Sequence, residues 1–214
     1  MPNYCMNCVE IKGNANEVEE LLSFVETEDS DFDFNIIVPI PDNVENTQRG
    51  SRSFASEAVS IYLRTQIISN HLKWMMEKDE VAIENLEQAI KKWESEKKID
   101  IELGYRIIEN RAKYNNCGDC YEWCIEYWGT KSVAWDIHIN NNSIYFDTAW
   151  TPCTPVIQKL AELYPGLEIE HSYFEPGVAL AGVDTYKNGE LIDLKVFDEG
   201  TNEYRYFSQF FYGI

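Results

Sequence analysis

"VAWDIHINNNSIYFDTAW", residues 133–150, is the stretch that decides the fold of this 214-residue chain. Apolar and polar side chains alternate on both sides of the "NNN" turn, which is the pattern of two half-buried strands joined by a short connection. The apolar faces consist of Trp135, Ile137 and Ile139 in the first strand and of Ile144, Phe146 and Thr148 in the second. We therefore predict an antiparallel pair of strands.

The residues after this pair predict a helix and further strands. "TPVIQKLAELYPG" (154–166) has a proline in its first turn and a Pro-Gly pair at its end, as helices prefer. "LEIEHSYFE" (167–175) alternates in the manner of a strand. "VALAGVDTYKNGELIDLKVF" (178–197) predicts a hairpin, because Asn188-Gly189 is the dipeptide that two-residue hairpin turns favour.

The residues before the pair begin with a strand and a helix. "YCMNCVEIKG" (4–13) predicts a short strand, and "NANEVEELLSFVE" (14–26) predicts a helix with one apolar side. "FDFNIIVPIP" (32–41) predicts an extended segment that ends where Pro39 and Pro41 interrupt it.

The middle of the chain differs from its flanks in charge and periodicity. Residues 61–113 carry ten acids and ten bases, whereas the segments before and after them have net charges of −9 and −10. We predict one helix after an N-cap at Ser56, a second ending in "KKWESEKK", and a third over 100–114, which Gly104 weakens. The apolar positions that indicate these helices are Ile61, Ile68, Leu72 and Met75 in the first and Leu86, Ile90 and Trp93 in the second.

Without this helical middle, the order of elements is strand, helix, strand, strand, helix, strand, followed by extra strands. That order is the split βαβ, or ferredoxin-like, topology, and it implies no iron–sulfur cluster. We therefore predict an α+β protein with a ferredoxin-like sheet, extra C-terminal strands and a helical insertion. The predicted domain is discontinuous, with 1–55 and 114–214 in the α+β part and 56–113 in the insertion.

The charge of the chain excludes some classes of partner. Thirty-seven Asp and Glu oppose 18 Lys and Arg, which gives a net charge of −19 at pH 7. A surface of this charge repels phosphate backbones and anionic membranes. We therefore expect no direct binding to nucleic acid, no membrane, and a partner with a basic surface. Solubility alone is the competing explanation of the charge.

Four segments carry a combined pattern that is specific to one family. They are "MPNYCMNCVEIKG" at the start, "FDFNIIVPIP", the Trp-Gly-Thr-Lys box of "YEWCIEYWGTKSVAWD", and the C-terminal part from "YFDTAWTPCTPVIQKLAELYPG" onward. Together they resemble the YubB-like family of phage and plasmid proteins over both flanks. Tyr4 departs from the family's Trp, and Ser132-Val133-Ala134 breaks its usual run after Lys131. The resemblance implies a ferredoxin-like domain and a mobile-element setting, and it implies no activity.

The cysteines are candidates for zinc. Two thiolates spaced as in Cys5/Cys8 and Cys117/Cys120 can bind one tetrahedral ion, but 108 residues separate the pairs. Cys5 and Cys8 also fall on opposite faces of a predicted strand. "MPNYCMNCVEI" lacks the features of a secretory leader and no run of about 20 apolar residues is present, so we predict a cytoplasmic protein with free thiols and no cofactor. Zinc, or a redox switch at Cys117/Cys120, is the alternative.

Other catalytic signals are weak. No nucleophile elbow, Walker loop or Rossmann glycine pattern is present, so no catalytic residue is assigned. His71 falls in a predicted helix, and we expect His138 and His171 to be partly exposed on adjacent strands. A metal-dependent enzyme would depend on four acids that we expect on the solvent face of the sheet: Asp136, Asp147, Glu170 and Asp184.

"YEWCIEYWGTK" (121–131) is the most aromatic stretch and fits neither a clean strand nor a clean helix. Its candidate box is Tyr121, Trp123, Tyr127, Trp128 and Lys131. We favour a core role in which the tryptophans pack the insertion against the sheet and Lys131 is an isolated counter-ion. The alternative is a single-stranded nucleic-acid binder that stacks bases on Trp128 and Tyr145.

The main functional hypothesis is a non-enzymatic, acidic interaction protein of a phage or other mobile element. Its carboxylates would replace nucleic-acid phosphates in the basic cleft of a host protein, as in a DNA-mimicking inhibitor of defence. The candidate partner-binding residues are Glu26, Glu28, Asp29, Asp31, Asp33, Asp198 and Glu199. The sequence leaves open the partner's identity, the oligomeric state and the role of the insertion, whose amphipathic helices suit a partner or a dimer.

Overall fold

The computed structural model describes residues 3–212, which form two compact units. The sheet unit combines the segment up to Pro39 with the segment from Cys124 onward, and the helical unit is Ile40–Trp123. The helical unit therefore begins earlier and ends later than the predicted insertion at 56–113.

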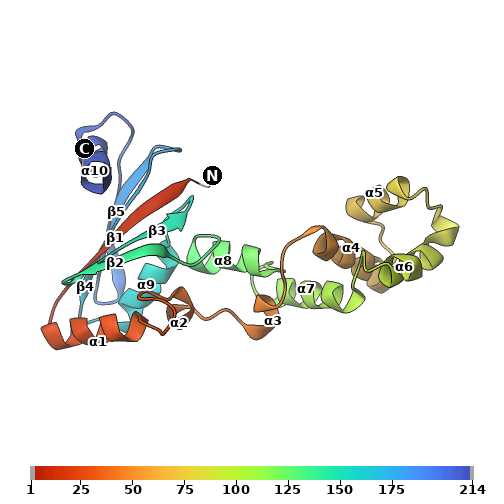
Figure 1. The fold of residues 1–214 in the computed structure, drawn as a ribbon, viewed down its shortest axis with the longest axis horizontal. Helices are drawn as coiled ribbons and strands as arrows, with labels where there is room; N and C mark the ends of the chain where they lie inside the picture. The colour runs from red at the N-terminus through yellow and green to blue at the C-terminus, as the bar shows by residue number, and fades with distance from the viewer. Residues whose placement is uncertain (1–2, 213–214) are drawn as a thin grey trace. The chain divides into compact units, whose positions relative to one another are not determined.

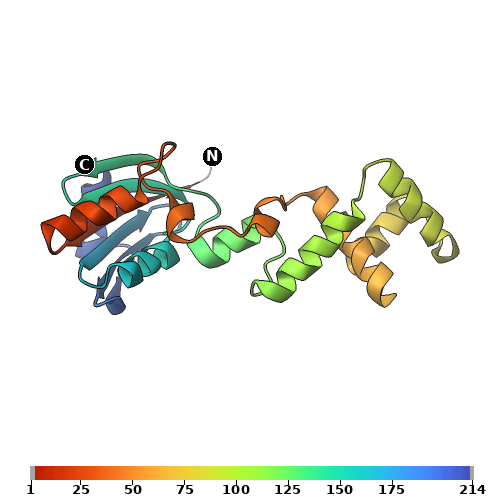
Figure 2. The ribbon, with the colours of Figure 1, turned by 90° about the horizontal axis from the view of Figure 1, so that it is seen from below.

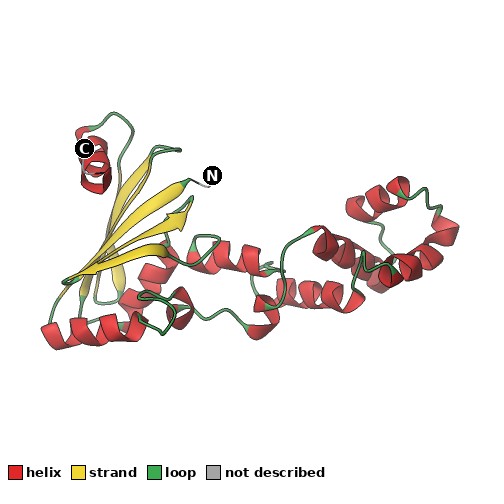
Figure 3. Ribbon diagram, viewed as in Figure 1, coloured by secondary structure: helices red, strands yellow, loops and turns green. Residues whose placement is uncertain are grey.

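The strands of the described residues form one antiparallel sheet (Figure 3). They are β1 (Tyr4–Lys12), β2 (Trp135–Asn140), β3 (Ser143–Ala149), β4 (Glu168–Glu175), β5 (Leu180–Lys187) and β6 (Glu190–Val196). Their order across the sheet is β2-β3-β1-β4-β5-β6. Helix α1 (Ala15–Val25) follows β1 and α9 (Thr154–Leu163) follows β3, so β1 to β4 have the ferredoxin-like arrangement, which β5 and β6 extend. The predicted fold class, with its extra C-terminal strands and helical insertion, is confirmed.

Helices α1 and α9 cover one face of this sheet (Figures 1 and 2). The Asn14 side chain caps α1 by accepting a hydrogen bond from the Asn16 N–H at 2.9 Å. Successive apolar positions of α1 are then buried at Val18, Leu21 and Val25. On the strands, residues of one parity face these helices, and Val9, Ile11, Ile144, Phe146 and Ile169 are buried there.

Helix α10 (Asn202–Tyr212), which the sequence interpretation overlooked, lies on the opposite face of the sheet (Figure 1). Its Phe207 forms a buried cluster with Phe174 and Ala181, and Met6 and Phe211 pack against that cluster. This packing covers part of the face that we expected to be in solvent. The aromatic spacing Tyr204, Phe207 and Phe211 is the helical signal that would have predicted it.

The segment predicted as extended at 32–41 contains a short helix instead. Phe34–Ile37 forms the short helix α2, because the Asp33 carboxylate accepts a hydrogen bond from the Asn35 N–H at 2.8 Å and Phe34 and Ile37 are buried one turn apart. The ferredoxin-like sheet therefore contains no strand from this segment.

Strand β2 departs from the regular alternation that the sequence predicted. Trp135 pairs with Asp147 and Ile139 pairs with Ile144, and the register shifts by a bulge between them. Asp136, at φ 52°, adopts a left-handed conformation in this bulge. Trp135 and Ile139 therefore point to opposite faces, so the prediction that they share one face is wrong.

The helical unit begins with α3 (Asp42–Glu45) and ends with the first residues of α8 (Cys120–Trp128). Between them lie α4 (Ser51–Thr65), α5 (Asn70–Lys78), a 3₁₀ turn, α6 (Leu86–Ser95) and α7 (Ile101–Lys113). Its core includes Val59, Leu72, Met75, Leu86, Ile90, Trp93 and Ile99. No helix of the described residues is long and apolar enough to cross a bilayer.

The first predicted helix of the insertion is two helices. Gln66 ends α4 with φ 60°, and the Ser69 hydroxyl then caps α5 by accepting from the Leu72 N–H at 3.3 Å. Ser56, the predicted N-cap, lies inside α4, where its hydroxyl donates to the Arg52 carbonyl at 2.6 Å and accepts from the Asp100 N–H at 2.8 Å. Both departures arise from local hydrogen bonds that periodicity does not detect.

Gly104 of α7 lies directly against α4. A Cβ atom at this position would overlap the Ser56 carbonyl and the Ser60 hydroxyl, so only glycine permits this spacing. Ser60 uses the same proximity to donate a hydrogen bond to the Ile101 carbonyl at 3.1 Å. The residue that weakened the sequence pattern is thus the one that allows α4 and α7 to pack closely.

Candidate functional site

The acidic loop that follows α1, residues 26–33, has a defined turn. The Thr27 hydroxyl accepts hydrogen bonds from the N–H groups of Asp29 and Ser30 at 3.4 and 3.1 Å, and the Thr27 N–H donates to the Ser30 carbonyl at 2.8 Å. This turn leaves Glu26, Glu28, Asp29 and Asp31 exposed. Asp33 is half-buried because its carboxylate caps α2.

This loop forms one wall of a groove of about 570 Å³. Glu28, Asp29, Asp31 and Asp33 line that wall, and the opposite wall contains Val133, Trp135 and Ile137 of the segment that leads into β2 and of β2 itself. Trp135 and Ile137 lie on either side of Asp136 in the β2 bulge, and bulges protect an edge strand such as β2 from pairing with another chain. The groove therefore presents carboxylates opposite apolar side chains.

The carboxylates of the groove form no ion pair among residues 3–212. No ion pair joins any acid of 26–33 to a Lys or Arg in the described part of the chain. Four of the five lysines of the sheet unit pair with other acids: Lys12 with Glu170 at 3.6 Å, Lys159 with Glu162 at 2.9 Å, Lys187 with Glu168 at 3.0 Å and Lys195 with Asp193 at 2.7 Å. The fifth, Lys131, lies over the Trp150 ring. Ion pairs within the described residues therefore do not offset the negative charge of the acidic loop.

The seven predicted partner-binding acids do not form a single surface. Asp198 and Glu199 are exposed in the loop that leads into α10, on the face of the sheet opposite α1 and α2 (Figure 1). Glu26 to Asp33 lie beside α2 on the other face. Of these acids, only those of the loop line the groove. The prediction therefore combined two groups of acids that the fold separates.

The aromatic stretch 121–131 is largely helix α8, which periodicity did not predict. Trp123 and Trp128 are buried, with 3% and 2% of their surfaces exposed. The Trp128 indole N–H donates to the Val38 carbonyl at 2.9 Å, and its ring meets Phe34 edge to face at 5.7 Å. Trp128 therefore offers no free ring face to a base, and the base-stacking alternative is wrong for this residue.

The other members of the predicted box have separate surroundings. Tyr121 is 39% exposed, and the Arg49 guanidinium lies 4.8 Å from its ring centre. Tyr127 is half-buried and lines a shallow hollow with Val38 and Pro39. Lys131 lies 5.8 Å from the ring centre of Trp150, so it interacts with an aromatic face. The five residues do not form one box.

Tyr145, the second residue of the base-stacking alternative, is half-buried on the α10 face. Its ring centre lies 6.4 Å from that of Phe210 of α10. Burial and the neighbouring Cys8 raise the pKa of its hydroxyl. The helix thus occupies the side of the sheet on which RRM-type domains stack bases.

The two Cys-x-x-Cys pairs belong to different units, Cys5/Cys8 to the sheet unit and Cys117/Cys120 to the helical unit. Burial raises the pKa of Cys5 and of Cys8 to about 12. No group of three or more His, Cys, Asp or Glu side chains is arranged to hold a metal ion within residues 3–212. The cysteines of β1 therefore behave as small core residues.

A buried polar row beneath α9 was not anticipated from the sequence. The Asn7 amide donates to the Thr148 hydroxyl at 2.9 Å and to the Cys5 carbonyl at 2.8 Å, and its oxygen contacts His171 Nε2 at 3.0 Å. His171 is fully buried and lies on β4, which β3 and β1 separate from the strand β2 of the exposed His138, so the expected pair of partly exposed, adjacent histidines is wrong.

Asp184, which we expected on the solvent face, belongs to the same buried layer. It is 1% exposed, and its carboxylate accepts from the Thr154 hydroxyl at 3.3 Å and the Tyr173 hydroxyl at 3.4 Å. Burial raises its pKa despite these hydrogen bonds. Asp147 lies on the other face, where burial and then Asp136 raise its pKa to about 6. These acids do not converge as a two-metal site requires.

The buried imidazole predicts a dependence of stability on pH. Burial lowers the pKa of His171 from 6.5 to about 3, and its Nδ1 has no hydrogen-bond partner in the described structure. Between these pH values the unfolded chain binds a proton that the folded chain does not, so stability falls as pH drops. We expect a loss of about 2 kcal/mol between pH 7 and about pH 5, measured by urea unfolding.

Two variants isolate the contribution of His171. His171→Phe is expected to remove this component of the pH dependence, whereas His138→Phe, at an exposed histidine beside Asp136, leaves it intact. An unchanged pH slope in His171→Phe would show that the buried ring is not its origin.

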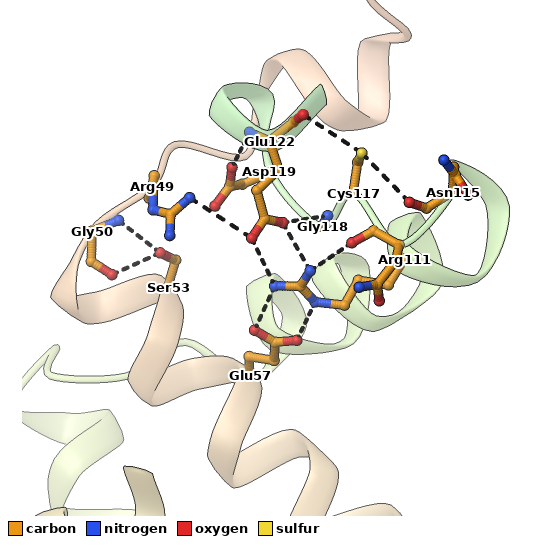
Figure 4. A network of polar contacts seen from close by, with 11 residues as sticks. Arg49, Gly50, Ser53, Glu57, Arg111, Asn115, Cys117, Gly118, Asp119 and Glu122 are labelled. Carbon is orange, nitrogen blue, oxygen red and sulfur yellow. Dashed lines mark hydrogen bonds and ion pairs between the residues drawn. The ribbon is translucent and has the colours of Figure 1, made fainter. Parts of the chain in front are cut away.

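A second polar network, in the helical unit, is centred on Arg111 (Figure 4). The guanidinium binds Glu57 of α4 at 2.5 Å and Glu122 of α8 at 2.8 Å, and it donates to the Asn116 carbonyl at 2.7 Å. Arg49 also approaches Glu122 at 3.7 Å. One half-buried cation therefore holds α4, α7 and the start of α8 together. The carboxylates of Glu57 and Glu122 are both engaged in these ion pairs.

One comparison with known families agrees with the ferredoxin-like part of the fold. Residues 133–211 match the family model described as the ferredoxin-like domain in Api92-like protein. The chain is also similar to a solved structure of a protein Api92 from Yersinia pseudotuberculosis, with 12% identity and a TM-score of 0.45, over 94% of this chain and 100% of that chain. No curated protein matches. The match to the family model runs from the start of β2 into α10; the YubB-like resemblance and its mobile-element setting stay predictions.

Proposed function

We propose that this chain is an interaction protein whose sheet unit binds a basic surface of a partner protein through the groove between residues 26–33 and β2. The observation that carries the proposal is the set of loop carboxylates, exposed and without ion pairs in the described structure, opposite the apolar side chains of Val133, Trp135 and Ile137. A lysine or arginine side chain fits both walls, because its aliphatic stem packs on apolar groups while its charged end binds carboxylate.

The distribution of charge supports this choice of surface. The sheet unit has 22 acids and six bases, a net charge of −16, whereas the helical unit has 15 acids and 12 bases, a net charge of −3. A field of this strength accelerates the approach of a basic partner and weakens as salt is added. We assign no catalytic residue to the sheet unit. His171 and Asp184, which are buried there, form hydrogen bonds within the core.

We further propose that the partner is a cytoplasmic host protein that binds nucleic acid. The loop carboxylates then take the place of phosphates, and the chain inhibits by mimicry of DNA. The YubB-like resemblance supports a phage or plasmid origin, and with it a role against host defence.

The test is a pull-down from host lysate at low and at high salt with three forms of the full chain. The loop variant combines Glu28→Gln, Asp29→Asn and Asp31→Asn. The control combines Glu19→Gln, Glu190→Gln and Glu203→Gln, which removes the same charge from exposed positions of the sheet unit outside both acidic groups. We expect the wild type and the control to retain a basic nucleic-acid-binding protein at low salt, and the loop variant to bind it at least about tenfold more weakly.

The result separates the groove from overall charge. Equal weakening in the loop variant and the control would attribute binding to net charge and overturn the assignment of the groove. Recovery of no basic nucleic-acid-binding protein at any salt concentration would overturn the proposed function itself.

A further inference from the structure

We propose that the helical unit contains a separate site for a free nucleotide, in a hollow of about 530 Å³ between the start of α4, helix α5 and the end of α6. Its size is within the range of small-molecule sites, and its lining combines apolar, aromatic and cationic side chains. This site is independent of the acidic groove, because all of its residues belong to Ile40–Trp123.

The aromatic part of the hollow contains one exposed ring above a buried floor. Trp74 of α5 is 52% exposed, whereas Trp93 of α6 is 1% exposed and is fixed by a 2.6 Å hydrogen bond from its indole N–H to Asp79. His71 lies 5.4 Å from Trp74, and Phe54 of α4 lies 6.3 Å from His71, between ring centres. A flat heteroaromatic ring therefore has an exposed partner for stacking at the mouth of the hollow.

The charged part of the hollow is cationic, unlike the protein as a whole. Arg52, Lys78, Lys97 and Lys98 line it, against Asp79 as the one acid of the lining described. Arg52 forms an ion pair with Asp100 at 3.2 Å, and Lys98 forms ion pairs with Asp79 at 3.4 Å and Glu96 at 2.9 Å. The Lys78 ammonium lies 5.0 Å from the Trp74 ring centre, and Lys97 has no ion pair among the described residues. Positive charge thus remains beside the exposed indole.

The start of α4 adds backbone donors to the same place. Ser51, the first residue of this 15-residue helix, lines the hollow. The N-cap residue is Gly50, whose N–H donates to the Ser53 hydroxyl at 2.8 Å, and Gly50 has no side chain to accept from the first turn. The first intrahelical bond is from the Phe54 N–H to the Gly50 carbonyl at 3.1 Å, so the N–H groups of the first turn before it are available to an anion. These donors, the lysines and the indole together suit a phosphate attached to a planar base.

The net charge of the chain favours a mononucleotide over a nucleic-acid strand. A strand carries one negative charge per nucleotide and is repelled along its whole length by a protein of charge −19. A nucleoside monophosphate brings at most two charges into the one cationic hollow described here. The predicted ligand is therefore a free nucleotide, with base and phosphate both contributing.

The experiment is calorimetric titration of the full chain with AMP, UMP, adenosine, inorganic phosphate and a single-stranded oligothymidylate. We expect AMP or UMP to bind more tightly than adenosine or phosphate alone, and more tightly than the oligonucleotide. Trp74→Ala is expected to weaken nucleotide binding at least about tenfold, which is the usual size of a lost base–aromatic stack. Lys97→Asn removes a charge while keeping a residue that tolerates the φ of 57° at this position.

Matched controls distinguish a site from general effects. Trp150→Ala removes another tryptophan that is 45% exposed beside a lysine, and Lys91→Asn removes an exposed lysine of α6 outside the hollow. The proposal requires weaker binding in Trp74→Ala and Lys97→Asn, both with unchanged circular dichroism, and unchanged binding in the two controls. It is overturned if no nucleotide binds at millimolar concentration, if all four variants behave alike, or if the oligonucleotide binds best.

Discussion

Replacing Gly104 by leucine is expected to lower the free energy of unfolding of the helical unit by about 4 kcal/mol. Leucine is a good helix former, so the loss does not arise from α7 itself. It arises because the new side chain would overlap the Ser56 carbonyl and the Ser60 hydroxyl, and α4 and α7 would have to separate. The hydrogen bond from Ser60 to the Ile101 carbonyl and the one from the Asp100 N–H to Ser56 would then be lost as well.

Urea unfolding followed by far-ultraviolet circular dichroism measures the effect, and hydrogen exchange locates it in α4 and α7. Ala112→Leu, at an exposed position of the same helix, is the control and is expected to change stability by less than about 0.5 kcal/mol. Gly104→Ala should have an intermediate effect. If Gly104→Leu were as stable as Ala112→Leu, the close packing of the two helices described here would be wrong.

The second large effect is expected from Arg111→Ala, which should destabilise the helical unit by about 2–4 kcal/mol. The side chains of Glu57 and Glu122 are only 16% and 24% exposed; Glu57 loses its cation, and Glu122 loses the nearer of its two, keeping Arg49 at 3.7 Å. Arg111→Lys should recover only part of this loss, because one ammonium cannot reproduce the bidentate bonds to Glu57 together with the bond to Glu122. Arg64→Ala removes the exposed pair with Glu109 at 3.3 Å and should cost less than about 1 kcal/mol.

The loss of stability in Arg111→Ala is expected to depend on pH. Burial raises the pKa of Glu122, but the Gly118 N–H and Arg111 outweigh burial, so the pKa is lower than usual. A lowered carboxylate pKa stabilises the folded state above the ordinary Glu pKa, and this contribution is lost as pH falls through the folded value. The difference between wild type and Arg111→Ala, followed by urea unfolding, should therefore shrink in acid. A constant difference from neutral to acidic pH would exclude the carboxylates as its source.

Elements whose hydrophobic period matches their environment were predictable from the sequence. The hairpin of β2 and β3, the Asn188-Gly189 turn and α9 with Pro155 in its first turn all occur where the pattern placed them. In each of them, local residue preference and tertiary burial favour the same conformation. The ferredoxin-like order followed from these elements and did not depend on the segment 32–41, whose predicted extended conformation was wrong at α2.

The errors occur where short-range hydrogen bonds or distant contacts override the period. A single cap from Asp33 turned a predicted extended segment into α2, and the positive φ of Gln66 divided a predicted helix into two. Asp136 introduced a bulge that no alternation of residues reveals. These features depend on one or two residues each, which is too little to change a periodic pattern.

Only the acidic wall of the candidate groove could be predicted from the sequence. The acidic run 26–33 was recognisable as a loop and as a charged surface, and the structure places it in the groove. Its apolar wall comes from Val133, Trp135 and Ile137, about 100 residues later in the chain, and only the fold brings the two together. The cationic hollow beside Trp74 was missed because its lining comes from α4, α5 and α6. Hydrophobic periodicity had merged the first two of these helices into one and had not located their ends.

The hydrogen bond from the Trp128 indole to the Val38 carbonyl has a consequence for how this chain can diversify. It joins the two backbone segments at which the sheet unit gives way to residues 40–123, within the sheet unit itself. The ladders of β1, β3 and β4 require no residue from that intervening stretch. Residues 40–123 are therefore not needed to pair these strands, and a short linker that joins Pro39 to Cys124 should leave a protein that still assembles its sheet.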